Sequence, residues 1–259
     1  MDLGLAGRRA LVLGASRGLG AAIARTLAEE GAAVAAASRS GGIGWADALP
    51  SDVRARIRPA VLDLADTDAC ASTVDALLAA GPIDILVNNS GGPPPGPVAS
   101  VTTAAWQQNF TIMAASLFDI GSRVVPGMTE RGWGRILTIV SSGVDQPIPN
   151  LGISNAVRAS VVGWSKTLAN ELAPKGVTVN VLVPGRIHTD RVDELDRAAA
   201  SRSGTTQEEI ALASAASIPA GRYGTPEEFA AVAAFLCSSR ASYVTGSKIR
   251  VDGGAIRAI

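Results

Sequence analysis

The chain has 259 residues, of which 47% are hydrophobic and 18% charged, and its 23 basic residues balance its 23 acidic residues. A single histidine and two cysteines exclude both a zinc site built from Cys and His ligands and a disulfide framework. The same scarcity limits any histidine-dependent nucleophilic catalysis to His188, and the balanced charge argues against a protein that binds nucleic acid.

No targeting signal is recognisable near Met1, and no run of about 18 apolar residues is long enough to span a membrane. We therefore expect a cytoplasmic protein with reduced cysteines and no membrane partner. The length permits one large domain or two small ones.

Short apolar runs alternate with longer helical patterns along the whole chain. Most of the short runs are apolar on both faces, as buried parallel strands are. This alternation predicts an α/β fold of the Rossmann type, a doubly wound, parallel, seven-stranded sheet with helices on both faces. No linker interrupts it, so we expect one dinucleotide-binding domain over residues 1–259. Strands are predicted at 10–14, 33–38, 57–62, 83–88, 135–141, 177–183 and 248–251, and helices near 18–30, 66–80, 102–131, 153–173 and 225–237.

A glycine-rich loop joins the first predicted strand to the first predicted helix. Gly14 allows a tight turn, Gly18 allows a ligand to approach the backbone, and Gly20 allows the helix to pack close to the strand. The free N–H groups of the helix N-terminus suit a pyrophosphate. The placement of this loop predicts a dinucleotide site rather than a plain turn. The expected cofactor contacts in the loop are Gly14, Ser16, Arg17, Gly18, Leu19 and Gly20.

The end of the second predicted strand indicates which nicotinamide dinucleotide is used. An acidic residue there would bind the ribose 2′-hydroxyl and repel a 2′-phosphate, but this position carries Arg39 instead. Arg17 can reach the same region, and guanidinium groups suit phosphate. We therefore expect NADP(H) to be favoured over NAD(H), the alternative being that both arginines are merely solvated.

Two irregular stretches follow. The proline-rich segment 91–97 is expected to be a stiff loop, either a plain connector or a wall of the ligand site at the carboxyl ends of the strands. The polar segment at about 186–222 is longer than a usual connection and is interpreted as a lid-like insertion.

Several motifs resemble the short-chain dehydrogenase/reductase family, with the 3-oxoacyl-acyl-carrier-protein reductase-like group as the closest type. The spacing Gly14-x-x-x-Gly18-x-Gly20 and the run Asn88-Asn89-Ser90-Gly91 are similar to family motifs, as is the run 184–189. The resemblance implies a small-molecule substrate and a homodimer or homotetramer. It also implies further cofactor contacts at Asp63, Leu64, Asn89, Gly91, Arg158, Pro184, Gly185, Ile187 and Thr189.

The catalytic positions that the resemblance implies are largely substituted. Ser142 falls at the catalytic serine, whereas the Tyr-x-x-x-Lys pair is replaced by Ser154 and Arg158, and the asparagine by Met113. A serine hydroxyl is far less acidic than a tyrosine, whose pKa of ~10 can be tuned for acid catalysis. Arg158 keeps a positive charge but cannot move protons, because it stays protonated.

Two hypotheses follow from these substitutions. In the first, the protein is an NADPH-dependent oxidoreductase acting on a carbonyl or alcohol: Ser142 orients the carbonyl, Arg158 stabilises the oxyanion, and a water or a substrate group supplies the proton. In the second, it binds nucleotide without ordinary carbonyl reduction, as a dehydratase, a cyclase or a binding protein. His188 is a candidate substitute acid, with a solvent-facing, inactive side chain as the alternative.

Overall fold

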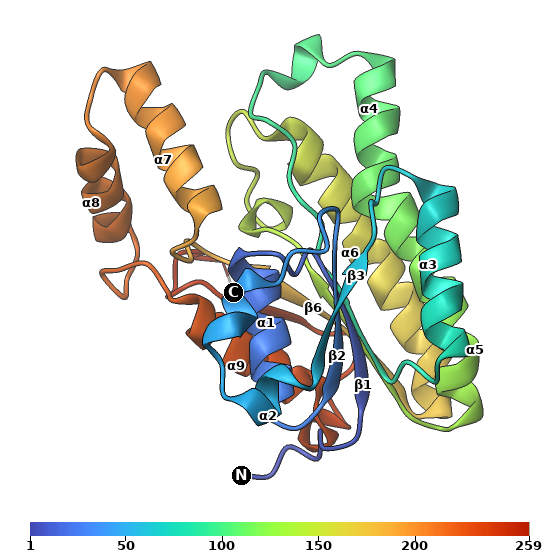
Figure 1. Cartoon of the computed structure of the whole chain (residues 1–259). Coiled ribbons are helices and arrows are strands. Elements are labelled where there is room, and N and C mark those ends of the chain that lie inside the picture. The colour runs from blue at the N-terminus through green and yellow to red at the C-terminus, as the bar shows by residue number, and fades with distance from the viewer. Residues whose placement is uncertain (259) are drawn as a thin grey trace.

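Seven parallel strands form one sheet in the computed structural model, which describes residues 1–258 (Figure 1). Their order is β3-β2-β1-β4-β5-β6-β7, which confirms the predicted doubly wound fold. The order reverses between β1 and β4, so the loops that follow these two strands diverge at the carboxyl edge of the sheet, where ligands bind in such folds. The strands are β1 (Arg9–Leu13), β2 (Ala33–Ser38), β3 (Ile57–Val61), β4 (Ile85–Asn88), β5 (Gly134–Ile139), β6 (Val177–Pro184) and β7 (Lys248–Val251).

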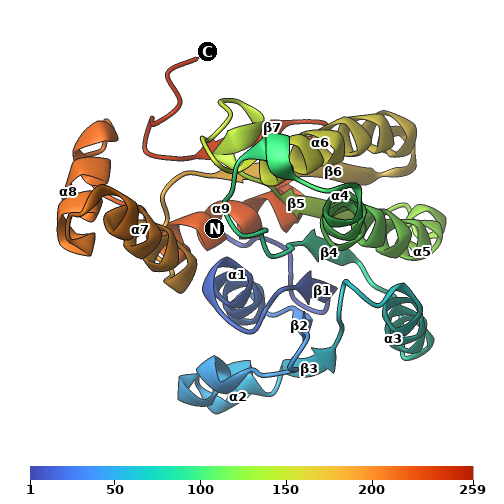
Figure 2. The same ribbon diagram turned by 90° about the horizontal axis from the view of Figure 1, so that it is seen from above.

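Helices cover both faces of this sheet, as Figure 2 shows from above. On one face, apolar residues of α1 and α9 pack against the strands, with Phe229 wholly buried among them. On the other face α3, α5 and α6 bury a second apolar layer that includes Leu117 and Ile120. The helices are α1 (Gly18–Glu29), α2 (Ser51–Arg54), α3 (Thr67–Ala79), α4 (Thr103–Phe110), α5 (Ser116–Glu130), α6 (Gly152–Leu172), α7 (Asp190–Ser203), α8 (Gln207–Ser217) and α9 (Pro226–Cys237).

The segment predicted as one helix over 102–131 is divided into two. A π-helical turn, Thr111–Ala115, separates α4 from α5. Such turns insert an extra residue in a helix and are frequent at functional sites. Met113 in this turn is buried against valines of α6 and β6.

The prediction that 186–222 is irregular is wrong in part, because this segment contains α7 and α8. Gly204 ends α7 in the left-handed conformation, and Thr206 and Glu209 form a capping box at the start of α8. Figure 1 shows the two helices standing beside the sheet as a hairpin (orange to brown). We call residues 190–217 the α7–α8 hairpin.

Within residues 1–258, no helix is both long and apolar enough to cross a membrane.

Candidate active site

The glycine loop after β1 has the geometry of a dinucleotide cradle. Gly14 has φ +63°, and a methyl group there would lie 2.7 Å from the Asn89 side-chain nitrogen. A methyl group on Gly20 would lie 2.2 Å from the carbonyl oxygen of Gly14. The first turn of α1 carries no acidic residue, and no side chain caps its N–H groups. These N–H groups therefore fit an anionic pyrophosphate.

The two arginines expected to recognise a 2′-phosphate lie in different surroundings. Arg39 is exposed directly after β2. Arg17, also exposed, pairs with Asp190 at 3.2 Å and with Glu194 at 3.4 Å, both on α7. The hydrogen bond to Asp190 raises the pKa of Arg17. The glycine loop is therefore tied to the α7–α8 hairpin through Arg17.

Trp45 was missed by the sequence reasoning. Its indole Nε1–H donates to the carbonyl oxygen of Ala15 at 2.9 Å, so it supports the glycine loop from the segment after β2. Only an unusual tryptophan in a glycine-rich connection hints at this role in the sequence.

The other expected cofactor contacts lie at the carboxyl ends of β3, β4 and β6. Asp63 and Leu64 follow β3, and the Leu64 carbonyl accepts a hydrogen bond from Ser116 at 2.7 Å. Asn89 donates to the carbonyl of Leu13 at 3.3 Å and so joins the ends of β4 and β1. Gly91 is exposed two residues further on.

At the end of β6, Pro184 is the last strand residue, and a methyl group on Gly185 would lie 2.5 Å from Asp252 Cα. Ile187 is buried. Thr189 is the N-cap of α7 and lies near Gly18, where a methyl group would be 3.7 Å from Thr189 Cγ2.

Arg158 is buried and holds the ends of β4 and β5 together. Its guanidinium donates to the carbonyl oxygens of Ile139 at 3.1 Å, Ser90 at 3.1 Å and Gly91 at 3.3 Å. Burial, together with the nearby charge of Arg191, lowers the pKa of Arg158 to about 10, so it remains charged at neutral pH. Arg158 therefore fixes the start of the loop that follows β4.

The segments that contain Ser142 and Ser154 lie together at the carboxyl edge of the sheet. Ser142 begins a short helical turn just after β5, and Ser154 is buried in the first turn of α6. Asn155 of α6 holds the loop between the two segments, because its side-chain amide donates to the carbonyl of Ile148 at 3.0 Å. A methyl group on Gly143 would lie 2.2 Å from Asn155 Oδ1. Neither serine hydroxyl has a hydrogen-bond partner within residues 1–258.

The proline-rich segment 91–97 is braced on both sides. The N–H of Gly96 donates to the carbonyl of Asn150 at 2.7 Å, which ties this segment to the loop before α6. Arg191 of α7 donates to the carbonyl of Pro93 at 3.0 Å. The segment is therefore held in place, as a stiff loop should be.

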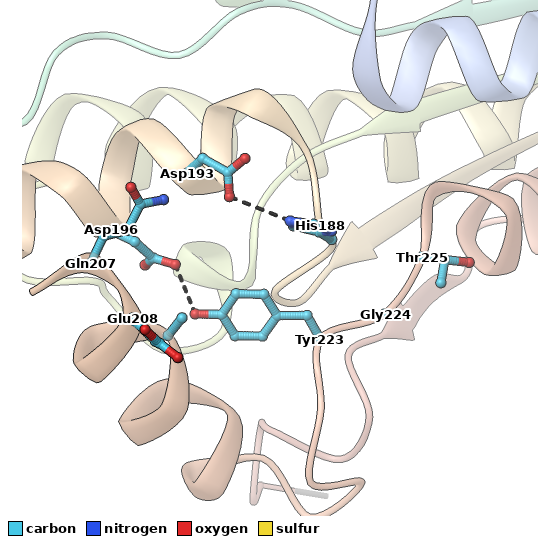
Figure 3. A pocket seen from close by; sticks show the side chains of 9 residues that line it. His188, Asp193, Asp196, Gln207, Glu208, Tyr223, Gly224 and Thr225 are labelled. Atoms are coloured by element: carbon cyan, nitrogen blue, oxygen red, sulfur yellow. Dashed lines mark hydrogen bonds and ion pairs between the residues drawn. The ribbon is translucent and has the colours of Figure 1, made fainter.

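A pocket of about 550 Å³ lies against the α7–α8 hairpin (Figure 3). His188 points toward Asp193, 3.5 Å away, and its side chain is 69% exposed. Tyr223 donates its hydroxyl to Asp196 at 2.9 Å, and partial burial raises the Tyr223 pKa. Tyr223 is therefore a weaker acid than a free tyrosine. Its partner Asp196 also forms an ion pair with Arg186.

Comparison with known proteins identifies relatives over nearly the full length. A family model described as Enoyl-(Acyl carrier protein) reductase matches residues 14–255. The 3-oxoacyl-(acyl-carrier-protein) reductase of Vibrio cholerae is 35% identical over 257 residues, which cover 97% of this chain and 98% of that protein.

Two solved structures are also similar to this chain over its full length. L-Sorbose reductase from Gluconobacter frateurii, complexed with NADPH and L-sorbose, has a TM-score of 0.91 and 29% identity, with complete coverage of both chains. A protein described as a member of the short-chain dehydrogenase/reductase family has a TM-score of 0.82 and 33% identity, again with complete coverage of both.

Proposed function

The chain belongs to the short-chain dehydrogenase/reductase family, and on this premise we propose that it is an NADP(H)-dependent oxidoreductase acting on the carbonyl of a small molecule by a non-standard proton relay. The observation that carries this proposal is the joint placement of Ser142, Ser154 and buried Arg158 beside a glycine cradle. The oxidoreductase relatives favour this hypothesis over a binding protein or a non-redox catalyst.

The preference for NADP(H) follows from charge. The cradle of Gly14, Gly18 and Gly20 suits the pyrophosphate, and no acidic residue stands at the end of β2. Arg39 is available to a 2′-phosphate, and Arg17 becomes available when it leaves its partners on α7. The NADPH bound in the related L-sorbose reductase is consistent with this choice.

The bound cofactor would supply the hydride, and the chain must then stabilise the oxygen that becomes negative. Ser142 donates a hydrogen bond to the substrate oxygen, and the buried charge of Arg158 stabilises the oxyanion. Ser154, at the position where the family resemblance implies a tyrosine, holds a water that protonates the oxygen. The new C–H bond takes the hydride that the bound cofactor would supply, and the new O–H bond takes a proton from this water as the carbonyl π bond is lost. The hydroxide that remains takes a proton from bulk solvent.

We further propose that the chain forms a homodimer or homotetramer. Large apolar side chains lie on its surface, with Phe110 42%, Phe235 40% and Tyr243 fully exposed. Light scattering on the purified protein at several concentrations would give the oligomeric state.

The proposed activity can be tested with NADPH and a panel of ketones, aldehydes and acyl thioesters. We expect a substrate-dependent loss of the reduced nicotinamide absorbance, and a fall in kcat of about 100-fold in Ser142→Ala, because one oxyanion donor is removed. Ser160→Ala, which changes an exposed serine of the same helix as Arg158, is the matched control. Tight NADPH binding without reduction of any compound would contradict the proposal.

A further inference from the structure

Three arginines and two carboxylates form a chain of contacts where α7 approaches the ends of β4 and β5. Arg17 and Arg191 are balanced by Asp190 and Glu194, since Glu194 accepts hydrogen bonds from both arginines. Arg158 adds a further charge that has no carboxylate partner within residues 1–258. Asp145, close behind Ser142 in the chain, is paired with Lys248 instead.

The two guanidinium groups of Arg158 and Arg191 hold one short stretch of backbone. Arg158 binds the carbonyls of Ser90 and Gly91 from the protein interior. Arg191 reaches the carbonyl of Pro93 from α7, and a methyl group on Gly92 would lie 3.7 Å from its Nη2. Arg158 lies one turn of α6 beyond Ser154, so the proposed function puts the substrate carbonyl close to this stretch.

Arg191 is the member of this pair that a small molecule can reach. Its side chain is 42% exposed, whereas Arg158 is buried. Its hydrogen bond to Glu194 is long, at 3.3 Å, and both partners are partly exposed. Exposed pairs of this kind contribute little, so a carboxylate brought by a ligand can replace Glu194 on the guanidinium.

We propose that the substrate carries a carboxylate and that Arg191 binds it. The unpaired charge of buried Arg158, which holds the same loop, favours this anion further. An unpaired buried cation is unfavourable, and a substrate anion supplies the missing negative charge. Arg191 is then a specificity-determining residue. This inference rests on the proposed function, in that it assigns the class of substrate to that site.

The test compares matched acids and esters on the NADPH-loaded protein. The probes are levulinate, phenylpyruvate and 4-acetylbenzoate, each against its methyl ester, with binding followed by NADPH fluorescence and turnover by absorbance. We expect at least one acid to bind about 10- to 100-fold more tightly than its ester. Arg191→Gln should abolish this difference by weakening the binding of the acid far more than that of the ester, and Arg191→Lys should restore part of it.

Arg197→Gln, which changes an exposed arginine on the same helix, is the control and should keep the preference for the acid. Equal binding of every acid and its ester, or an equal loss for both in Arg191→Gln, would overturn the inference. Because binding and turnover are read separately, Arg191-dependent binding of an acid without any reduction would refute the proposed function and leave the carboxylate site standing.

Discussion

The cofactor cradle requires that residue 20 has no side chain. Since a methyl group there would meet the Gly14 carbonyl at 2.2 Å, Gly20→Ala must displace the loop or α1. Overpacking of this kind costs about 1–3 kcal/mol. We expect a lower midpoint of thermal unfolding and NADPH affinity weakened by at least about tenfold, from displaced N–H donors.

Gly44 provides the control for this substitution, because a methyl group there would contact nothing within 4 Å. Gly44→Ala should leave NADPH affinity unchanged. If Gly20→Ala binds NADPH with the affinity of the parent chain, the glycine loop does not hold the pyrophosphate of the cofactor. Both affinities can be measured by the fluorescence of the bound reduced nicotinamide.

The charge of Arg158 predicts the pH dependence of turnover. Burial lowers the pKa of Arg158 to about 10, so the charged form that stabilises the oxyanion persists below that pH and is lost above it. We expect kcat with a ketone substrate to stay level from about pH 6 to 9 and to fall as the pH rises through about 10. Initial rates in overlapping buffers would reveal this profile. A fall centred near pH 7 would indicate another titrating acid.

Only part of this site could be predicted from the sequence. The glycine spacing can be read from the sequence, and the positions of Ser142, Ser154 and Arg158 are implied by the family resemblance. The partners of Arg158 could not be predicted, because the carbonyls that it binds lie at the end of β5 and just after β4, two strands that are brought side by side only when the sheet forms. Trp45 was missed for the same reason, because the Ala15 carbonyl that it binds belongs to the loop after another strand. Asn155 was missed although its partner Ile148 is near in the chain, because the fold of the loop that brings them together leaves no pattern in the sequence.

At the scale of elements, two helices begin with the same capping box but differ in their packing. Thr225 and Glu228 cap α9, which buries six residues, including Phe229, in the core. Thr206 and Glu209 cap α8, which buries none. Loss of an N-cap costs about 1 kcal/mol. Thr225→Ala should therefore lower the free energy of global unfolding by about that amount, and Thr206→Ala should leave it unchanged.

Urea unfolding followed by circular dichroism would measure the Thr225→Ala effect, and hydrogen exchange would locate the effect of Thr206→Ala within the α7–α8 hairpin. An equal loss of global stability in both variants would show that the hairpin unfolds together with the sheet. The comparison is internally controlled, because the residue changed and its partner glutamate are the same in both helices.

The same contrast explains which elements could be predicted. The strands and the helices packed on them were found because their burial imposes apolar runs or stripes. The helix α8 has no buried face, so its caps and its alanine content were the only signals. The π-helical turn at Met113 was missed because an extra residue in a helix leaves the average hydrophobic pattern almost unchanged.

For the whole molecule, we propose that the described residues form a single domain. One sheet carries both apolar layers, so neither layer can be exposed without disrupting the strands that support the other. We expect tryptophan fluorescence and circular dichroism to report the same urea midpoint. Separate midpoints, with one layer unfolding first, would contradict a single domain.

The α7–α8 hairpin is joined to the rest of the molecule partly by exposed ion pairs, which makes its docking sensitive to salt. Arg17 pairs with Asp190 and Glu194 across the cradle, and Arg191 links Glu194 to the loop after β4. Each exposed pair contributes about 0–1 kcal/mol, and salt screens it.

We therefore expect subtilisin to cleave residues 190–217 up to about fivefold faster in high salt than in low salt, after correction with a flexible reporter peptide. In low salt, Glu194→Gln should be cleaved faster than the parent chain, because it removes one ion pair of Arg17 and the ion pair of Arg191 while the Arg17–Asp190 pair remains. Glu208→Gln, which changes an exposed residue of α8, should behave as the parent chain. A cleavage rate that neither salt nor Glu194→Gln alters would mean that apolar packing alone holds the hairpin, and Arg17 would then be free to meet a 2′-phosphate without any cost in docking.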